Sequence, residues 1–148
     1  MEILIRPLCA GDVPAAAAIE AAVPDGWSEN GIRGALESDA ARCFFALAGG
    51  EGAGFAAFTC AGGEANLDAL SVAPAWRRRG VARALLTHAL AQLAGEGAGE
   101  AFLEVRASNA PAQALYRSLG FIQIGIRKGF YTNPREDAVL MRKELCRG

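Results

Sequence analysis

The spacing of apolar and polar residues predicts a chain that mixes helices and strands. Apolar side chains recur every three or four residues over 81–93 and again over 112–119, which predicts two amphipathic helices that end at nearby glycines. Shorter apolar runs bounded by glycine or charged residues are typical of strands. The predicted strands are Glu2–Arg6, Cys43–Ala48, Gly54–Cys60, a strand that follows Gly63 and ends at Val72, Ala101–Val105, Phe121–Lys128 and Ala138–Lys143.

Cap residues predict where two further helices begin. Asp12, followed by Pro14, predicts the N-cap of an alanine-rich helix that runs to about Val23. Ser28 predicts the cap of a short second helix that ends near Glu37. Two helices in succession therefore separate the first strand from the second.

Turn residues predict how the remaining elements connect. The run 49–52 between two strands predicts a hairpin, and Gly62-Gly63 predicts a second turn, so three strands in succession form an antiparallel meander. Asn109 followed by Pro111 predicts the start of the last helix, which Gly120 ends. The order of elements predicts a mixed α/β (α+β) fold.

Length and composition fit a single domain over residues 1–148. A chain of this length with 52% apolar residues fills one core with helices and strands. The formal net charge of −1 argues against direct nucleic-acid binding, which normally requires a strongly basic domain. The sequence has no apolar run long enough to span a membrane and no secretion signal, so we expect neither insertion nor export.

The four cysteines form no recognisable disulfide or zinc pattern. Cys9, Cys43, Cys60 and Cys146 are far apart, without a C-x-x-C pair, and His88 is the single histidine. We therefore expect no bound metal, and a cytoplasmic location fits this cysteine usage. His88 lies in the middle of a predicted helix and is interpreted as a surface residue.

A basic segment lies between a predicted strand and a predicted helix. Residues 77–82 are R-R-R-G-V-A. The first turn of a helix leaves backbone N–H groups unpaired and carries the positive end of the helix dipole, so this junction suits a phosphate group. Gly80 lets the backbone approach such a ligand closely. The alternative is a solvated basic turn that favours RNA or anionic surfaces.

This segment and two later ones resemble a known family. The spacing R-x-x-G-x-A is similar to the acyl-CoA loop of the GNAT acetyltransferases. The segments L-E-V-R-A-S-N-A (103–110) and A-L-Y-R-S-L-G-F (114–121) resemble the RimI-type protein N-terminal alanine acetyltransferases. Likeness at 27–29 and 135–138 extends the resemblance over nearly the whole chain. One departure is Phe130-Tyr131, where the family often has two tyrosines.

The resemblance implies the GNAT fold, in which helices flank both faces of a mostly antiparallel sheet. It also implies transfer of an acetyl group from acetyl-CoA, as co-substrate, to a protein N-terminus. For this group the acceptor is the N-terminal alanine of a small-subunit ribosomal protein, and transfer is direct within a ternary complex. No metal and no membrane partner are implied, and the oligomeric state stays open.

The resemblance assigns the cofactor contacts to three places: the end of one strand, the basic loop that follows it and a helix-cap residue. Backbone groups at the end of the third meander strand would hold the pantetheine arm and the acetyl carbonyl, although the same residues also suit an ordinary core strand with a local bulge. The basic loop would hold the pyrophosphate, and Asn109 would add a polar contact. The residues so assigned are Leu70, Ser71, Val72, Arg78, Arg79, Gly80, Val81, Ala82, Arg83 and Asn109.

Two residues are candidates for acid–base chemistry. Glu104 shares one face of its strand with Phe102 and Arg106. The family assigns the matching glutamate as the base that accepts the proton of the attacking amine, and the alternative is a surface carboxylate paired with Arg106. Tyr116 would protonate the departing thiolate in the same way, but packing alone also explains its place on an apolar helix stripe.

Four residues are candidates for contact with the acceptor. Trp27, Tyr131, Glu136 and Asp137 lie in loops that border the acceptor groove in the resembling enzymes. The two carboxylates would favour a basic residue near the start of the acceptor. Trp27 is also placed to pack on the helix that follows it.

Two other functions remain open at this point. The chain is either a GNAT acetyltransferase for a lysine or a small-molecule amine, which needs a closed acceptor pocket, or a non-catalytic module that binds acyl-CoA. Glu104, Asn109 and Tyr116 together favour an enzyme.

Overall fold

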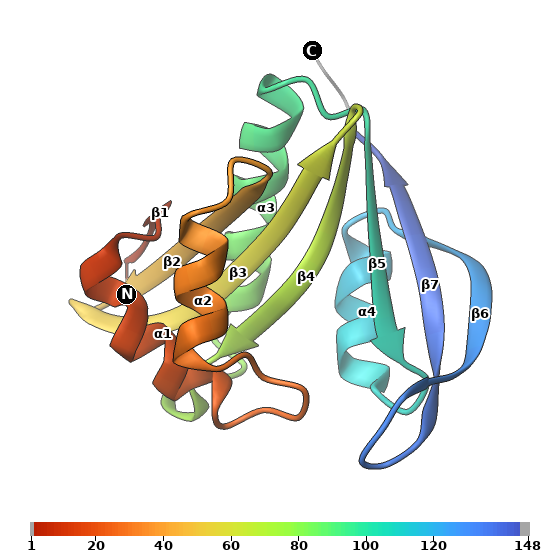
Figure 1. The fold of residues 1–148 in the computed structure, drawn as a ribbon, viewed down its shortest axis with the longest axis horizontal. Helices are drawn as coiled ribbons and strands as arrows, with labels where there is room; N and C mark the ends of the chain where they lie inside the picture. The colour runs from red at the N-terminus through yellow and green to blue at the C-terminus, as the bar shows by residue number, and fades with distance from the viewer. Residues whose placement is uncertain (1, 146–148) are drawn as a thin grey trace.

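The sheet is the central feature of the computed structural model, which describes residues 2–145. Seven strands of this range form one sheet with the order β1-β2-β3-β4-β5-β7-β6 (Figure 1). All neighbours are antiparallel except β4 and β5, so the expected mostly antiparallel sheet is confirmed. The strands are β1 (Ile3–Pro7), β2 (Ala41–Ala48), β3 (Glu51–Ala61), β4 (Glu64–Val72), β5 (Glu100–Arg106), β6 (Ile122–Tyr131) and β7 (Glu136–Glu144).

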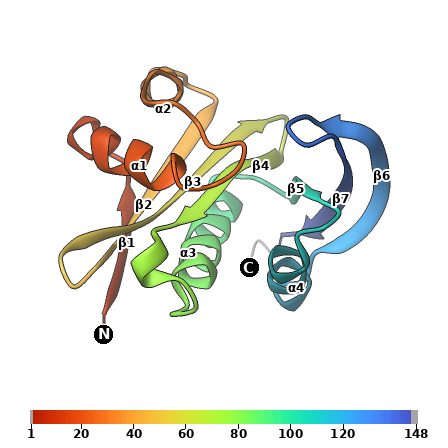
Figure 2. The ribbon, with the colours of Figure 1, turned by 90° about the horizontal axis from the view of Figure 1, so that it is seen from below.

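Helices cover both faces of the sheet, as expected, but unevenly. The helices are α1 (Val13–Glu20), α2 (Glu29–Leu36), α3 (Val81–Gly95) and α4 (Ala110–Ser118), with 3₁₀ turns at Ala10–Asp12 and Pro74–Trp76. α1 and α2 lie over β1–β4 on one side, and α3 and α4 lie on the other (Figure 2). On the first side, no described helix covers β5, β7 and β6 (Figures 1 and 2). We call this exposed side of the three strands the open face.

Each helical layer buries its own apolar cluster against the sheet. Ile32 of α2 shares one cluster with Phe45 and Phe55 of the meander. Leu86 of α3 and Leu103 of β5 belong to a larger cluster on the opposite side. Burial of such side chains contributes about 1.5–3 kcal/mol each, so the sheet is held firmly between the two layers.

The parallel pair of strands is short. β4 and β5 are paired only between Glu64–Leu67 and Glu100–Leu103. Beyond these residues β4 stays with β3 as far as Val72, while β5 stays with β7 as far as Arg106. The two strands therefore diverge, and the second half of β4 has an edge without a strand partner (Figure 1).

A bulge in β4 accompanies this divergence. Leu67 is paired with Phe58, and Ala69 is paired with the adjacent Ala57, so Asp68 is an extra residue in β4. Such a bulge bends a strand and disturbs its ladder. It precedes the segment 70–72, where the sequence suggested a bulge.

Two of the predicted helix caps are confirmed. Ser28 Oγ accepts the N–H of Gly31 at 3.1 Å, at the start of α2. Asn109 Oδ1 accepts the N–H of Ala112 at 3.2 Å, at the start of α4. Both side chains are fixed by bonds within their own helix turn.

Asp12 is the N-cap residue of α1, as predicted, but its side chain makes no cap hydrogen bond. Its carboxylate binds Arg6 Nη2 at 2.9 Å and accepts the Cys9 N–H at 2.9 Å, so it is directed away from α1. A 3₁₀ turn precedes α1, and the helix ends at Glu20 rather than near Val23.

Several strands also exceed their predicted limits. β3 begins at Glu51 instead of Gly54, and β6 continues to Tyr131 instead of Lys128. Apolar periodicity is weak in these extensions, where pairing with a neighbouring strand sets the limits.

The remaining sequence expectations concern thiols, metals and membranes. Cys9, Cys43 and Cys60 are free thiols, and Cys146 lies outside the described residues. Between residues 2 and 145, no group of three or more metal-ligating side chains is close enough to hold an ion. In the same range no helix has the length and hydropathy to span a membrane. His88 is exposed, as expected.

Candidate active site

A pocket of about 280 Å³ lies where β4 and β5 diverge. Its walls come from the α1–α2 connection, β4, β5, the start of α4 and the end of β6. Residues as far apart in the chain as Glu20 and Tyr131 thus meet at one place. The predicted site residues that line it are Leu70, Glu104, Asn109, Tyr116 and Tyr131.

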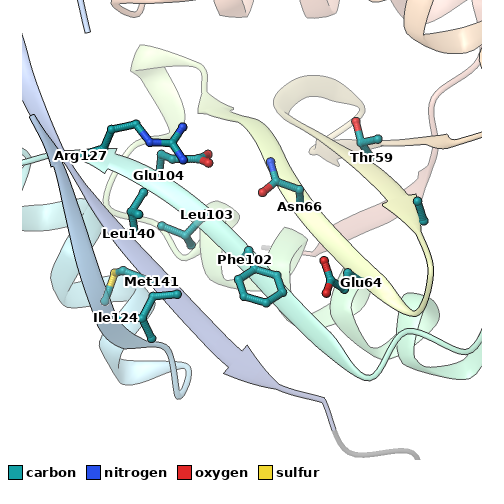
Figure 3. A pocket seen from close by; sticks show the side chains of 11 residues that line it. Thr59, Glu64, Asn66, Phe102, Leu103, Glu104, Ile124, Arg127, Leu140 and Met141 are labelled. Atoms are coloured by element: carbon teal, nitrogen blue, oxygen red, sulfur yellow. The ribbon is translucent and has the colours of Figure 1, made fainter. Parts of the chain in front are cut away.

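Side chains along β5 alternate between the two faces of the sheet. One set is buried in the core, and the other set faces the pocket and the open face. Leu103 and Val105 are buried in the cluster with α3 and α4. Glu104 therefore lies on the other side, and Figure 3 shows it next to Arg127 at one end of a hollow on the open face. Glu104 is half-buried, and across residues 2–145 no hydrogen bond or ion pair to its carboxylate is formed. This carboxylate is available to a ligand.

The Tyr116 side chain both packs and lines the pocket. It is 6% exposed, and its ring meets that of Phe121 edge to face at 5.9 Å between centroids. Burial raises the pKa of Tyr116 above its ordinary value, and Tyr131 acts in the same direction. The phenol therefore keeps its proton at neutral pH, as a proton donor must.

Tyr131 lies close to both catalytic candidates. Burial, followed by the charge of Glu104, raises the pKa of Tyr131 to about 12. Glu104, Tyr116 and Tyr131 all line the same pocket. Phe130 packs edge to face on Tyr131 at 5.0 Å and is 42% exposed.

Arg106 connects the loops around the pocket, which the sequence did not predict. Its guanidinium binds both oxygens of Asp25 at 2.9 and 3.0 Å and Glu136 Oε1 at 3.2 Å. It also donates to the carbonyls of Thr132 and Pro134, and it lies 4.5 Å from the centre of the Tyr131 ring. The α1–α2 connection is thereby tied to the β6–β7 connection across the end of β5.

This network changes the interpretation of Glu104. Arg106 was a possible partner for it, but the guanidinium is instead bound by Asp25 and Glu136. The pKa of Arg106 is raised, with the Asp25 hydrogen bonds as the largest cause, while that of Glu136 is lowered, chiefly by its hydrogen bond to Ser108.

The other two acidic candidates have structural partners and do not line the pocket. Glu136 Oε2 accepts the Ser108 N–H at 2.6 Å, and Asp137 Oδ1 accepts the Gly129 N–H at 2.9 Å. Both carboxylates thus organise the β6–β7 segment. The expectation that they orient a basic acceptor loses its geometric basis.

Trp27 also packs against the core and does not line the pocket. Its ring meets Phe55 edge to face at 6.1 Å, in the cluster under α1 and α2. Its backbone N–H donates to Glu20 Oε1 at 2.9 Å. Glu20 is 2% exposed, lines the pocket and was missed by the sequence analysis, because a lone glutamate at a helix end carries no local signal.

The basic loop leads into α3 through a left-handed residue. Gly80 has φ of 82° and ψ of 10° and precedes a helix whose first turn has no side-chain cap. Arg78 also has a positive φ, of 63°. The resulting exposed N–H groups, with the helix dipole, fit an anionic group such as the CoA pyrophosphate.

Arginines of the loop have different partners. Arg79 lies over the Trp76 ring at 5.4 Å, and Arg83 Nη2 binds Ser118 Oγ at 2.8 Å. Arg83 therefore connects α3 to α4, beside the pocket. Val81 is a core residue, and Ala82 is half-buried in the first turn of α3.

The end of β4 supplies backbone groups rather than side chains. Leu70 and Val72 pack against the α3 cluster, and Ser71 is 3% exposed. Ser71 Oγ is the one fully buried side-chain oxygen or nitrogen within residues 2–145 that has no hydrogen-bond partner. The unpaired β4 edge, followed by the basic loop, fits an elongated cofactor with an amide-rich arm and phosphates, which acetyl-CoA has.

The diverging parallel strand pair, the exposed loop before α3 and the pocket that Glu104 shares with Tyr116 fit an acyltransferase. The sequence model of the acetyltransferase (GNAT) family matches residues 15–121, and the chain belongs to this family.

Individual relatives narrow the comparison. The chain is 49% identical over 80 residues to the [Ribosomal protein bS18]-alanine N-acetyltransferase of Escherichia coli K12, which covers 53% of this chain and 54% of the relative. The chain thus spans about half the length of the curated relatives it matches in this comparison. It is also 36% identical to the streptothricin acetyltransferase of Streptomyces lavendulae over 124 residues, or 81% of this chain and 66% of that protein.

A solved structure extends the likeness to the whole fold. The crystal structure of the ribosomal-protein-S18-alanine N-acetyltransferase from Escherichia coli superposes with a TM-score of 0.88 at 38% identity. The match covers 97% of this chain and 94% of that one. The expected GNAT fold and the resemblance to the RimI group are confirmed.

Proposed function

We propose that this protein transfers the acetyl group of acetyl-CoA to the α-amino group of a protein N-terminus. The preferred acceptor is the N-terminal alanine of a small-subunit ribosomal protein. The observation that supports this most is the convergence of Glu104, Tyr116 and Tyr131 in one pocket, at the unpaired edge of β4. The likeness to the alanine N-acetyltransferase of Escherichia coli supports the choice of acceptor.

Glu104 acts as the base in this proposal. Its free carboxylate accepts the proton of the acceptor ammonium, directly or through a water molecule. An α-amino group has a reference pKa of about 7.7–8.0 against about 10.4 for lysine, so an ordinary carboxylate suffices for an N-terminal acceptor. Backbone N–H groups at the β4 edge polarise the acetyl carbonyl.

Tyr116 acts as the acid. Its phenol carries a proton at neutral pH and donates it to the departing thiolate of the cofactor. The residues that line the pocket include no cysteine, serine, threonine or lysine that would form an acyl intermediate. This lining supports direct transfer, with both substrates bound together, as the mechanism we propose.

A small-molecule amine is the second candidate acceptor. The 36% identity with a streptothricin acetyltransferase over 81% of this chain favours it, since that similarity is longer than the match to the curated ribosomal enzyme. A lysine acceptor or a non-catalytic module that binds acyl-CoA remains the further alternative.

Competition among acceptors tests the proposal. The protein is incubated with acetyl-CoA and otherwise identical peptides that begin with alanine, serine, methionine or leucine, and the products are identified by mass spectrometry. A peptide with a blocked terminus and a free lysine, together with streptothricin, completes the panel. We expect the alanine peptide to be modified fastest at its terminus. Preferred acetylation of streptothricin or of the blocked peptide would overturn the proposal.

A further inference from the structure

The bridge that Arg106 forms between two connections of the chain has one buried end and one exposed end. The side chains of Arg106 and Glu136 are 11% and 19% exposed, whereas that of Asp25 is 43% exposed. At the buried end the guanidinium also binds the Thr132 and Pro134 carbonyls of the β6–β7 connection. At the exposed end it binds both oxygens of the Asp25 carboxylate. Arg106 is thus fixed to the β6–β7 connection and reaches across to the α1–α2 connection, and Figure 1 shows both connections at the end of the molecule where β5 ends.

Further contacts hold the buried end of this bridge. The second oxygen of Glu136 accepts the Ser108 N–H at 2.6 Å, and the guanidinium lies 4.5 Å from the centre of the Tyr131 ring. The backbone of Arg106 is also fixed, because the Gln113 amide in α4 donates to its carbonyl at 3.1 Å. Gln113 is 8% exposed, so water competes little for this bond. β5, the start of α4 and Tyr131 therefore form one firmly connected wall of the pocket.

The α1–α2 connection forms another wall of the pocket and has fewer anchors. Residues 23–26 line the pocket there. Hydrogen bonds from the N–H groups of residues 21–27 end on acceptors within residues 17–23, so they stay inside the segment. Across residues 2–145, the pair of Asp25 with Arg106 is the one hydrogen-bonded link from residues 21–27 to another part of the fold. This wall is therefore held in place by the packing of Trp27 on Phe55 and by Arg106.

On the basis of the proposed function, we infer that Arg106 is a positioning residue that determines which first residue of the acceptor fits. It contacts Asp25 on one wall of the pocket and the Tyr131 ring on the other, so it sets the distance between them. A fixed wall favours a small first residue, because a larger one has to push the wall aside. A lysine cannot take this role, because an ammonium group lacks the planar fork that binds two carboxylates and two carbonyls at once.

Two peptides measure this role. They are identical except that one begins with alanine and the other with leucine, and kcat/KM for N-terminal acetylation is compared within each protein variant. Effects that are equal for both peptides cancel in this alanine-to-leucine ratio. We expect Arg106→Gln, Arg106→Lys and Asp25→Asn each to lower the ratio about fivefold or more. Arg106→Gln combined with Asp25→Asn should lower it no further than Arg106→Gln alone, because both changes break the same contact.

Arg142 provides a matched control. It is also an arginine that pairs with a glutamate between β7 and β5, in this case Glu100, but it does not line the pocket. Arg142→Gln should keep the wild-type ratio. Hydrogen exchange read by mass spectrometry adds a local measurement: residues 21–27 should exchange faster in Arg106→Gln and Asp25→Asn, and at the wild-type rate in Arg142→Gln.

The remaining outcomes separate this role from the proposed function. If Asp25→Asn is folded and keeps the wild-type ratio, Arg106 does not position this wall, and the proposed function still stands. An equal loss in Arg142→Gln and Arg106→Gln has the same meaning. If Arg106→Gln does not fold, Asp25→Asn decides alone, since its side chain lies at the exposed end of the bridge. N-terminal acetylation of neither peptide by the wild-type protein would overturn the proposed function, and this role with it.

Discussion

Gly26 makes a contact that no other residue type allows, and its substitution should separate the role of the α1–α2 connection from general stability. A Cβ at this position would lie 1.8 Å from the Glu20 carbonyl oxygen and 2.7 Å from the carbonyl carbon. Real Cβ contacts stay beyond 3.0 Å, so Gly26→Ala forces two backbone segments apart by about 1.2 Å or more. Overpacking of this kind costs about 1–3 kcal/mol.

The displaced segment forms one wall of the active-site pocket. It carries Asp25, which binds Arg106, and it precedes the Trp27 N–H, which binds Glu20. We expect Gly26→Ala to lower Tm by about 3–10 °C for a chain of this size and to raise KM for the acceptor. KM for acetyl-CoA should change less, because residues 77–83, which we assign to the pyrophosphate, do not line the pocket.

Gly34→Ala is the control for Gly26→Ala. Gly34 lies inside α2, and a Cβ there meets nothing within 4 Å. Alanine at this position should stabilise the protein by about 0.5–1 kcal/mol, without any change in KM. Thermal melts and steady-state kinetics on both variants give the answer. If Gly26→Ala matches the wild type in Tm and in acceptor KM, then the contact does not set the shape of this wall.

Four further predictions follow from the site. Tyr116→Phe and Glu104→Gln should each lower kcat by about 10²-fold or more, with acetyl-CoA affinity retained; full turnover of either variant, when chemistry limits the rate, would refute its assigned role. Gly80→Val should raise KM for acetyl-CoA, because φ of 82° is strained for valine, and unchanged KM in a folded protein would remove the loop from the cofactor site. Ser71→Ala should leave urea stability unchanged or higher, since the hydroxyl is buried without a partner; a clear loss would reveal a hidden hydrogen bond. Stability should fall as pH rises from about 10 to 12, because the folded state holds the Tyr131 proton in a range where the unfolded state releases it, and urea titrations should show a shallower fall in Tyr131→Phe.

Local signals in the sequence were sufficient for features that depend on neighbouring residues. Ser28 and Asn109 cap helices through hydrogen bonds to residues three positions away. A short segment of sequence is therefore enough to predict each cap. Gly80 adopts the positive φ that its position before a helix requires. The family resemblance then placed Glu104 and Tyr116, which the structure brings into one pocket.

Distant partners explain what the sequence could not predict. Arg106 binds Asp25, 81 positions away, and Glu136, 30 positions away, so no spacing in the chain reveals the network. Asp12 likewise occupies the predicted N-cap position of α1, but its carboxylate binds Arg6, because the preceding strand brings that guanidinium close. Glu136 was predicted to contact the acceptor. Its carboxylate instead binds Arg106 and the Ser108 N–H, and neither partner is indicated by the sequence around Glu136.

The parallel ladder between β4 and β5 is the one place where the sheet changes direction, and it is short. Only four residue pairs form this ladder between the strands β1–β4 and the strands β5–β7. Leu67 and Leu103 end this ladder in the core, at 6% and 2% exposure. A change in side-chain volume there would alter the angle between the two parts, and with it the distance from Glu104 to the β4 edge. Acceptor choice in this protein therefore depends on packing between the two parts of the sheet as well as on the side chains that face the acceptor.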